Sequence, residues 1–510
     1  MKVKIRRQLN RRKRRIQRRL DKFNLEGCER PMFTGSNIHY DISERDRAIA
    51  HGGIGAIHAL AKRLGLAEAI DRRLVLFKFH LPYHESDHVL NIAYNAFCEG
   101  TCLEDIELRR NDEAFLDAIG ARRIPDPTTA GDFCRRFRDT GDIHSLQQAL
   151  HDVRLKVWAA QPASFFEQAI IDMDGTLVGT NGSCKQGMDI SYKGTWGYHP
   201  LVVSLANTGE VLSIVNRPGN RPSHEGAAAE IERCVALCFR GGFRRILLRG
   251  DTDFSQTERL DSWSADPRIQ FIFGYDSCTN LKEIAEKLPP CAWKKLERPP
   301  HYVVATKKRR RPENVKDRVV KQRRFDTLRL QSEEVAEFNY RPTACKLDYR
   351  MVVVRKNITK EKGELRLHDE IRYFFYITND WIREANEIVF CANDRCDQEN
   401  LLAQLHSGCR ALAAPVDNLE SNWAYMVMTA LAWDLKAWWA LMLPQGVGRH
   451  RESYRADQDW LLGLEFKTFV QAFVRLPCQI VRTGRQILYR LLSWNQYQPI
   501  FFRLVDALGC

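Results

Sequence analysis

The stretch FFEQAIIDMDGT, at 165–176, has the pattern of a buried strand that ends in two carboxylates. A short apolar run of this kind is typical of a strand covered on both faces of a sheet. Because side chains alternate along a strand, Asp172 and Asp174 lie on the same face. The stretch therefore predicts a central strand of an α/β sheet with acidic groups at its end.

Further strand patterns follow at 199–205, 211–216 and 245–248, and a helix is predicted at 224–239. The last of these strands runs into Asp251, so the first and last strands of this unit each end in an aspartate. A later strand at 372–377 precedes helical stretches at 381–390 and 397–405. Glu399 lies on the second stretch, and Arg395 stands one helical step before it on the same face.

Asp174, Asp251 and Glu399 can converge on one edge of such a sheet. Three carboxylates suit two Mg²⁺ ions, with Mn²⁺ as a substitute, because hard divalent cations prefer oxygen ligands. Two such ions activate water or a 3′-OH and stabilise the leaving oxygen in an in-line attack on phosphorus. Each carboxylate taken alone more often caps a helix or binds backbone N–H groups. The three together, in this order and beside basic segments, favour a metal site.

The positive charge of the chain is concentrated in two segments. The chain has 510 residues, 44% of them hydrophobic, and a formal net charge of +14. Residues 1–30 carry +10 and residues 307–324 carry +8, so the remainder sums to −4. The length indicates two or three domains with real cores. The two basic segments indicate a polyanionic partner, most simply nucleic acid, the alternative being a solvated tail and a solvated loop.

Three other patterns restrict the class of protein. The 15 cysteines include no CxxC pair, which is typical of a reduced intracellular chain without a zinc ribbon. The Arg-rich start lacks the apolar segment of a secretory signal. The most apolar stretch, 424–443, contains Asp434 and Lys436, which predicts a buried helix rather than a membrane span. We therefore expect a cytoplasmic protein without a membrane partner.

The run HESDH at 84–88 matches the H-E-x-x-H pattern of zinc proteases. Pro82 and Tyr83 come directly before it, which places the run at the start of a helix. There Ser86 or Asp87 can cap the helix, and Glu85 suits its dipole. No third-ligand motif follows, so we expect a helix start rather than a zinc site.

The first strand also permits a different enzyme. IDMDGTLV at 171–178 is similar to the first motif of haloacid-dehalogenase-type phosphatases, in which Asp172 would be the nucleophile and Asp174 the general acid. GDTD at 250–253 imitates the metal motif of that family, but Ser255 stands where a second Asp is usual. Strands rather than a cap follow Val178. This phosphatase and a catalytically inert DNA-binding protein are the alternative interpretations.

The chain resembles bacterial insertion-sequence transposases of the DDE type, in the group whose ribonuclease-H-like domain is split by a β-rich insertion. The likeness covers about 33–445, and no single motif decides it. The segments that carry it are PTTAGDFCRRF at 127–137, IDMDGT at 171–176, KGTWGYHPLVV at 193–203, LLRGDTDF at 247–254, RYFFYITN at 372–379 and RCDQEN at 395–400.

The resemblance implies a catalytic and metal-binding triad of Asp174, Asp251 and Glu399. It also implies that Arg395 contacts DNA phosphate. Two positions depart from the family pattern: Ala392 stands where a Tyr is frequent, and His406 stands where a Lys is frequent. The roles of the neighbouring Asp172 and Asp253 stay open.

The resemblance further implies a multidomain fold. We predict a basic DNA-binding arm at 1–30, a helical DNA-binding domain at 31–160, a ribonuclease-H-like α/β catalytic domain at 161–264 and 372–420, a β-rich insertion at 265–371 and a helical region at 421–510. The predicted partners are double-stranded DNA, as inverted-repeat ends and target, and a second copy of the chain. The predicted location is the bacterial cytoplasm, with the nucleoid.

The basic segments supply the predicted DNA contacts, since Lys and Arg neutralise backbone phosphates. Besides Arg395, the predicted DNA-binding residues are Arg11, Arg12, Arg14, Arg15, Lys307, Lys308, Arg309, Arg310, Arg311, Arg323 and Arg324. Arg135, Arg136 and Arg138 follow a Thr128-Thr129 cap signal, which fits a DNA-binding helix and an ordinary surface helix equally well.

Overall fold

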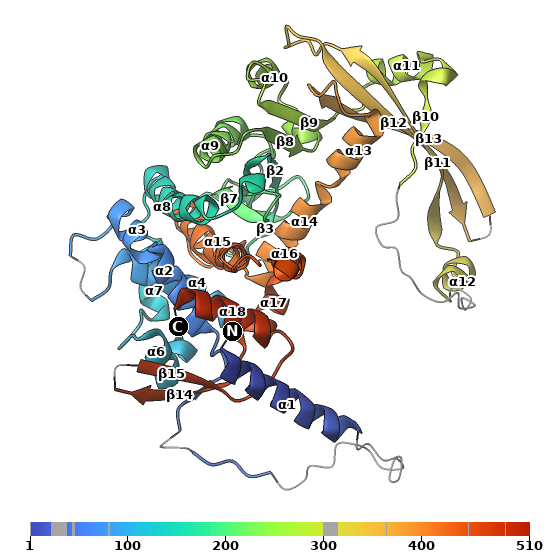
Figure 1. Cartoon of the computed structure of the whole chain (residues 1–510). Helices are drawn as coiled ribbons and strands as arrows, with labels where there is room; N and C mark the ends of the chain where they lie inside the picture. The colour runs from blue at the N-terminus through green and yellow to red at the C-terminus, as the bar shows by residue number, and fades with distance from the viewer. Residues whose placement is uncertain are drawn as a thin grey trace.

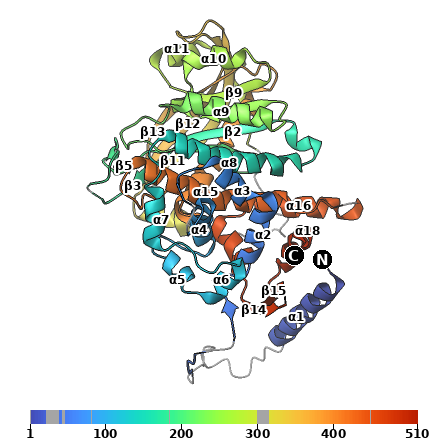
Figure 2. The ribbon, with the colours of Figure 1, turned by 90° about the vertical axis from the view of Figure 1, so that its left-hand side faces the viewer.

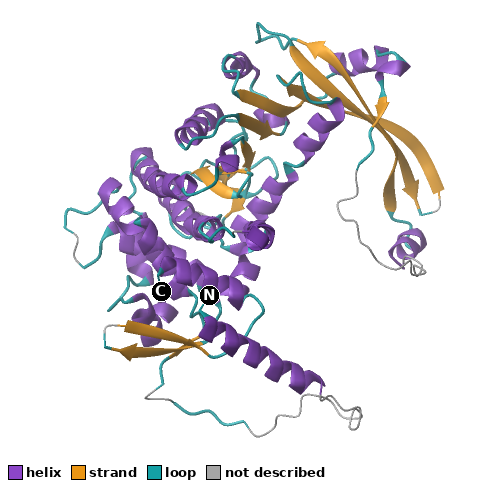
Figure 3. Cartoon of the chain, in the orientation of Figure 1, coloured by secondary structure: helices purple, strands orange, loops and turns teal. Residues whose placement is uncertain are grey.

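A computed structural model describes residues 2–21, 38–42, 46–79, 82–182, 184–298, 315–363, 365–446, 448–484 and 486–509. Helices gather at one end of the molecule, and long strands extend from the other end (Figure 3). The predicted combination of helical regions with a large mixed α/β sheet is confirmed. The basic run at 307–311 lies outside the described residues.

One nine-stranded sheet runs through the molecule in the order β10-β11-β12-β13-β9-β8-β2-β6-β7. Its strands are β2 Ala169–Gly175, β6 Leu201–Leu205, β7 Glu210–Val215, β8 Ile246–Gly250, β9 Ile269–Tyr275, β10 Lys294–Lys295, β11 Asp326–Tyr340, β12 Tyr349–Lys362 and β13 Leu365–Thr378. Strands β2, β8 and β9 are parallel, and the other pairs are antiparallel. The carboxyl ends of the three parallel strands therefore meet at one edge, which we call the carboxyl edge.

The predicted insertion is continuous with this sheet. Strand β9, which falls inside the predicted insertion at 265–371, pairs in parallel with β8. Strand β13 pairs with both β9 and β12, so β11, β12 and β13 extend the same sheet as a long ribbon (Figure 1). The predicted boundary at 265 therefore falls between two strands, β8 and β9, that are hydrogen-bonded to each other. The division of the chain into domains stays a prediction.

Helices cover both faces of the sheet because its strands alternate apolar side chains. Ile246 and Leu248 of β8 share a core with the helices α9 Ala227–Arg240, α10 Thr257–Ser264 and α11 Thr279–Lys287. Leu247, between them in sequence, packs instead in the core that holds Ile388 and Val389 of α13 Ala385–Asn393. The continuous apolar run of β8 is thus explained by burial on both faces.

The N-terminal and C-terminal regions form one helical body. At its centre lies α15 Leu419–Leu441, which contacts α2, α4, α8 and α16 and also strand β7. The remaining helices of this body are α2 Ile54–Leu64, α3 Leu66–Arg73, α4 Glu85–Phe97, α5 Ile106–Arg110, α6 Glu113–Ile119, α7 Pro127–Cys134, α8 Thr140–Ala159, α16 Arg451–Leu462, α17 Phe466–Phe469 and α18 Gln498–Leu508. The predicted regions 31–160 and 421–510 therefore share a core.

The C-terminal region is not wholly helical, which corrects the prediction for 421–510. It contains the hairpin of β14 Cys478–Thr483 and β15 Gln486–Leu491, and β14 also pairs with β1 Ala48–Ile49. The basic helix α1 Val3–Asp21 docks near this hairpin by a stripe of its less exposed residues, Ile5, Leu9, Arg12 and Ile16.

Shorter elements complete the chain. They are the strands β3 Val178–Gly179, β4 Asp189–Ile190 and β5 Trp196–Tyr198, the helices α12 Val315–Gln322 and α14 Cys396–Ala403, and the single turns η1 Ala163–Phe166, η2 Thr252–Phe254, η3 Pro290–Ala292, η4 Gln404–Gly408, η5 Gly448–His450 and η6 Val470–Val474. Strands β3, β5 and β4 form a small separate sheet.

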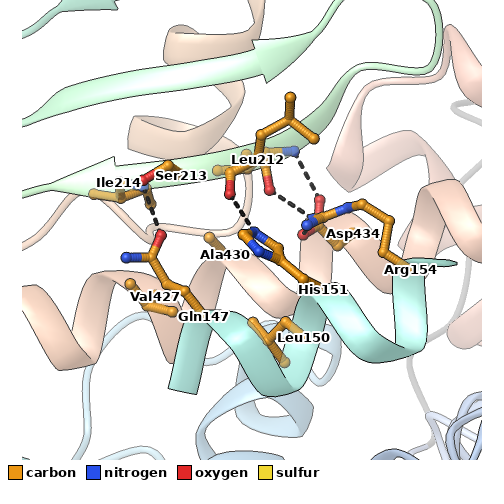
Figure 4. A pocket seen from close by; sticks show the side chains of 11 residues that line it. Gln147, Leu150, His151, Arg154, Leu212, Ser213, Ile214, Val427, Ala430 and Asp434 are labelled. Atoms are coloured by element: carbon orange, nitrogen blue, oxygen red, sulfur yellow. Dashed lines mark hydrogen bonds and ion pairs between the residues drawn. The ribbon is translucent and has the colours of Figure 1, made fainter. Parts of the chain in front are cut away.

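Helix α15 is buried along nearly its whole length, as its sequence predicted. Its Asp434 accepts hydrogen bonds from Arg154 Nη2 at 2.6 Å and from the backbone N–H of Val211 at 2.8 Å (Figure 4). A fully buried charge of this kind is stable only when paired. No helix in the described part of the chain combines the length and apolarity of a membrane span.

The HESDH run starts a helix, and that interpretation is confirmed. Helix α4 begins at Glu85, and Asp87 accepts the backbone N–H of His84 at 2.9 Å in a capping box. The fully buried Glu85 Oε1 accepts the backbone N–H groups of Leu76 and Phe77 at 2.9 and 3.0 Å. Glu85 thus fixes the segment that precedes the helix.

Glu85→Ala is expected to lower the free energy of unfolding by about 1–3 kcal/mol, because it leaves two backbone donors without their acceptor. Urea denaturation measures the change. The matched control is Glu68→Ala on the exposed side of α3, which should change stability by less than about 0.5 kcal/mol. Equal effects of the two substitutions would contradict the assigned role of Glu85.

Candidate active site

Asp174 and Asp251 lie at the carboxyl edge of the sheet, at the ends of two neighbouring parallel strands. In the parallel pair of β2 and β8, Asp172 is the register partner of Arg249. This is the last register pair of the two strands; Asp174 lies two residues further along β2, and Asp251 directly follows the end of β8. The negative charge of Asp251 raises the pKa of Asp174, which indicates that the two carboxylates lie near each other. The sheet register therefore brings together two carboxylates that stand 77 positions apart in the sequence.

Asp251 is held by the turn that it starts. It caps the single turn η2, where its carboxylate accepts the backbone N–H of Asp253 at 3.0 Å. This bond uses one oxygen of the carboxylate, Oδ1. Burial raises the pKa of Asp251, while the charge of Arg395 lowers it.

Arg395 and Glu399 reach the same edge from α14, which packs on β2. Arg395 Nη1 lies 3.2 Å from Asp174 Oδ2, and its Nη2 lies 3.9 Å from Glu399 Oε1. The side chain of Glu399 is 63% exposed, whereas that of Asp174 is 16% exposed. The structure thus assembles all four residues predicted for the site, with Glu399 on its open side.

The carboxylates repel one another electrostatically. Burial raises the pKa of Asp174 to about 6, and the charges of Asp251 and Glu399 act in the same direction. Arg395 opposes this shift because its guanidinium supplies a positive charge beside Asp174. Because the negative charges of these carboxylates repel one another, a cation that binds beside them stabilises the site.

The donor set fits a hard divalent cation in its chemistry, since it consists of carboxylate oxygens. In the described ranges, no three His, Cys, Asp or Glu side chains stand close enough together to hold a metal ion as they are. Asp174 and Asp251 are the paired donors, Glu399 stands further out, and Arg395 occupies the space beside Asp174. The three carboxylates are therefore chemically suitable ligands for a divalent cation, and Arg395 supplies a positive charge beside Asp174.

Asp172 has a structural role, which the sequence left open. Its two carboxylate oxygens accept hydrogen bonds from Nε and Nη2 of the buried Arg249, at 2.7 and 2.6 Å. Arg249 Nη1 also donates to the backbone carbonyl of Cys391 at 3.0 Å, which ties α13 to the sheet. A buried carboxylate held at both oxygens is unavailable as a nucleophile, so the geometry disfavours the phosphatase interpretation. Asp253, by contrast, is exposed.

Apart from Arg395, the described basic residues that are predicted to bind DNA lie away from these carboxylates. Arg323 and Arg324 are exposed directly after α12, at the far end of the ribbon, and α1 lies at the foot of the molecule (Figure 1). Arg11, Arg14 and Arg15 are exposed on α1. Arg12 differs, because it donates to the carbonyls of Leu491 and Ser493 at 3.0 and 3.1 Å and so anchors the helix.

Lys307, Lys308, Arg309, Arg310 and Arg311 lie outside the described residues, so their predicted contacts stay predictions.

A cavity of about 450 Å³ opens beside Asp251 and Arg395, and sequence reasoning missed it. Its walls come from the ends of β8 and β9, from the part of β13 where its pairing with β9 ends, and from the junction of α13 and α14. Tyr275 and Phe374 are among its aromatic residues, and Ala392 also lines it. The one available signal was Ala392 itself, since a small residue at that position leaves space.

Two histidines also flank the site. His406 Nε2 lies 2.9 Å from Thr176 Oγ1, and this contact connects η4 with the end of β2. His199 Nδ1 lies 2.7 Å from the carbonyl of Arg221, so this nitrogen is the donor and Nε2 carries the lone pair in the neutral ring. Burial lowers the pKa of both imidazoles, which favours their neutral forms.

An acidic pair at the carboxyl edge of a mixed sheet, with an Arg and a Glu beside it, agrees with the arrangement expected of an enzyme with a DDE triad. A family model described as transposase DDE domain, group 1, matches residues 45–509, and the chain belongs to this family of transposases. Such transposases are polynucleotidyl transferases that generally use divalent metal ions.

Comparison with solved structures finds a distant likeness. The chain is similar to a piggyBac transposase in a synaptic complex with hairpin DNA, at 11% identity and a TM-score of 0.33, over 90% of this chain and 86% of that chain. No curated protein matches the sequence.

Proposed function

We propose that this chain binds double-stranded DNA at inverted-repeat ends, cleaves it there and transfers the cleaved strand into target DNA. The catalytic residues are Asp174, Asp251 and Glu399, at the carboxyl edge of a ribonuclease-H-like domain. The observation that carries the proposal is the parallel pairing of β2 and β8, whose carboxyl ends lie at one edge of the sheet, with Asp174 in β2 and Asp251 directly after β8. Arg395, which bridges toward Glu399, completes the arrangement.

Asp174, Asp251 and Glu399 are the residues that would hold two Mg²⁺ ions, with Mn²⁺ as a substitute. Bound ions supply activation of the attacking water or 3′-OH and stabilisation of the leaving oxygen. The chain contributes the positions of the carboxylates, since strand β2 holds Asp174 and the turn η2 after β8 holds Asp251. Arg395 contributes two donors in a planar fork, which matches the oxygens of a DNA phosphate beside the carboxylates.

Exposed basic residues hold the DNA on either side of this site. Arg11, Arg14 and Arg15 on α1 and Arg323 and Arg324 after α12 neutralise backbone phosphates, which gives binding without sequence preference. The unit that acts is a homodimer, because two ends must be joined in one reaction. It acts on the DNA of a bacterial nucleoid, in the cytoplasm.

The test is cleavage of a labelled duplex that carries the terminal inverted repeat from the DNA beside the coding sequence. The wild type is expected to cut at the repeat end in Mg²⁺ and not in EDTA. Glu399→Gln should lower this rate by about 100-fold or more, while the affinity for the duplex changes by less than about twofold. The matched control is Glu452→Gln on the exposed face of α16.

Each alternative function has its own outcome in this assay. Full Mg²⁺-dependent cleavage by Glu399→Gln would show that the assigned triad is wrong. A wild type that binds the duplex but cuts no end with any divalent ion would be a catalytically inert DNA-binding protein. Hydrolysis of a small phosphate monoester that depends on Asp172 would support the phosphatase.

A further inference from the structure

A short hairpin stands beyond the carboxyl edge and has no part in the proposed metal site. It consists of β4, β5 and the turn between them, residues 189–198, and we call it the edge hairpin. Strand β5 pairs with β3, which follows β2 after only two residues. Figure 2 shows β3 and β5 at the left rim of the molecule.

The tip of the edge hairpin is rigid. The backbone N–H groups of Ser191 and Gly194 donate to the carbonyls of Thr195 and Ser191, each at 2.8 Å. The N–H of Thr195 donates to Ser191 Oγ at 3.1 Å. Gly194 has φ +77°, a left-handed conformation that glycine adopts without strain. These bonds therefore define the backbone conformation of the turn.

This rigid tip presents aromatic rings to solvent. Tyr192 is 85% exposed, and Trp196 is 53% exposed beside its cross-strand partner Ile190. Tyr198 of the same hairpin is fully buried and donates to the carbonyl of Gln186 at 2.8 Å, so it anchors the hairpin. Exposed rings gathered on one rigid turn are typical of a binding surface.

The edge hairpin lies close to the strand end that carries Asp174. The backbone N–H of Thr180, six residues after Asp174, donates to the carbonyl of Trp196 at 3.0 Å. Six residues span at most about 20 Å. The charge of Lys193 acts on His199, and a Cβ on Gly175 would lie 2.8 Å from His199 Nε2. The hairpin therefore lies within about 20 Å of Asp174, near enough to contact a DNA duplex bound at this site.

We propose that the edge hairpin binds the DNA bases beside the cleavage site, with Tyr192 and Trp196 stacked on bases that have left the duplex and Lys193 on the adjacent phosphate. The proposal rests on the proposed function, since that function makes DNA the partner. Aromatic rings stack on any unpaired base, and wedging them between base steps opens a duplex. Lys193 supplies the matching charge: its Nζ lies 5.3 Å from the centre of the Tyr192 ring, and no ion pair joins it to a carboxylate in the described part of the chain.

The experiment compares two fluorescent duplexes that carry the same repeat end, one blunt and one with two unpaired terminal bases. Anisotropy is measured in EDTA, so that no cleavage occurs. The wild type should bind the unpaired end about tenfold more tightly. Tyr192→Ala and Trp196→Ala should each reduce this preference to within about twofold, and Tyr192→Phe should retain it. Lys193→Gln should weaken binding of both duplexes equally.

The matched control is Trp381→Ala, which removes a ring that is 54% exposed but lies after β13, at the opposite edge of the sheet. It should leave the preference unchanged. Equal binding of both duplexes by the wild type, or a preference that survives Tyr192→Ala, would overturn the assignment of the hairpin. So would hairpin variants that alter only the oligomeric state on size exclusion. A wild type that binds neither duplex would instead overturn the proposed function.

Discussion

Replacing Asp174 with asparagine is expected to lower the rate of DNA end cleavage by about a thousandfold or more. The amide keeps the shape of the side chain but removes the negative charge that a divalent ion requires at the centre of the site. A thousandfold loss corresponds to about 4 kcal/mol of transition-state stabilisation. The measurement is single-turnover cleavage in Mg²⁺ with the repeat-end duplex. Asp459→Asn, on the exposed face of α16, is the matched control and should cleave like the wild type.

Asp174→Asn should at the same time stabilise the fold. The folded state raises the pKa of Asp174 to about 6, so it binds a proton more tightly than the unfolded chain does. Asp174 therefore contributes its full stabilisation of the folded state below about pH 4, and this contribution is lost as the pH rises through about 6. The neutral amide removes this loss, which is up to about 3 kcal/mol at pH 7.5.

Thermal unfolding separates the two effects of this substitution. At pH 7.5 without divalent ions, the melting temperature of Asp174→Asn should equal or exceed that of the wild type. Mg²⁺ should raise the melting temperature of the wild type, because it relieves the repulsion between Asp174 and Asp251, and should leave the variant unchanged. If the variant melts at a lower temperature than the wild type, misfolding explains its lost cleavage. If Mg²⁺ raises both melting temperatures equally, the ion binds elsewhere.

The approach of Asp174 to Asp251 could be predicted because it depends on local rules. An apolar strand that ends in Asp174 and a second that ends in Asp251 meet at one edge whenever the strands are parallel. The role of Asp172 could not be predicted, since it depends on register. Only the pairing of β2 with β8 shows that Arg249 stands opposite Asp172, and a shift by one residue would separate them.

The joining of the two chain ends could not be predicted either. Ala48 pairs with Gln479, and Arg12 donates to the carbonyl of Leu491. Contacts between segments more than 400 residues apart leave no periodic pattern in either segment. The buried character of α15 was visible from its composition, whereas its position at the centre of both terminal regions required the tertiary structure.

Glu210→Ala is expected to lower the free energy of unfolding by about 3–5 kcal/mol. Glu210 on β7 is fully buried and pairs with Arg154 of α8 at 3.0 Å. Its two oxygens also accept hydrogen bonds from the indole N–H groups of Trp158 and Trp438, at 3.0 and 2.8 Å. Because these partners lie on α8 and α15, the carboxylate connects the sheet with the helical body.

The size of this effect follows from what the substitution leaves behind. Without Glu210, Asp434 is the one remaining acidic partner of the buried Arg154 among the described residues, and two indole donors lose their acceptor. Desolvation of these groups is then uncompensated. Urea denaturation at pH 7.5 measures the loss. The matched control is Glu107→Ala, which breaks an exposed pair with Arg110 and should cost less than about 0.5 kcal/mol. If Glu210→Ala cost no more than this control, the buried cluster would not be what holds the helical body to the sheet.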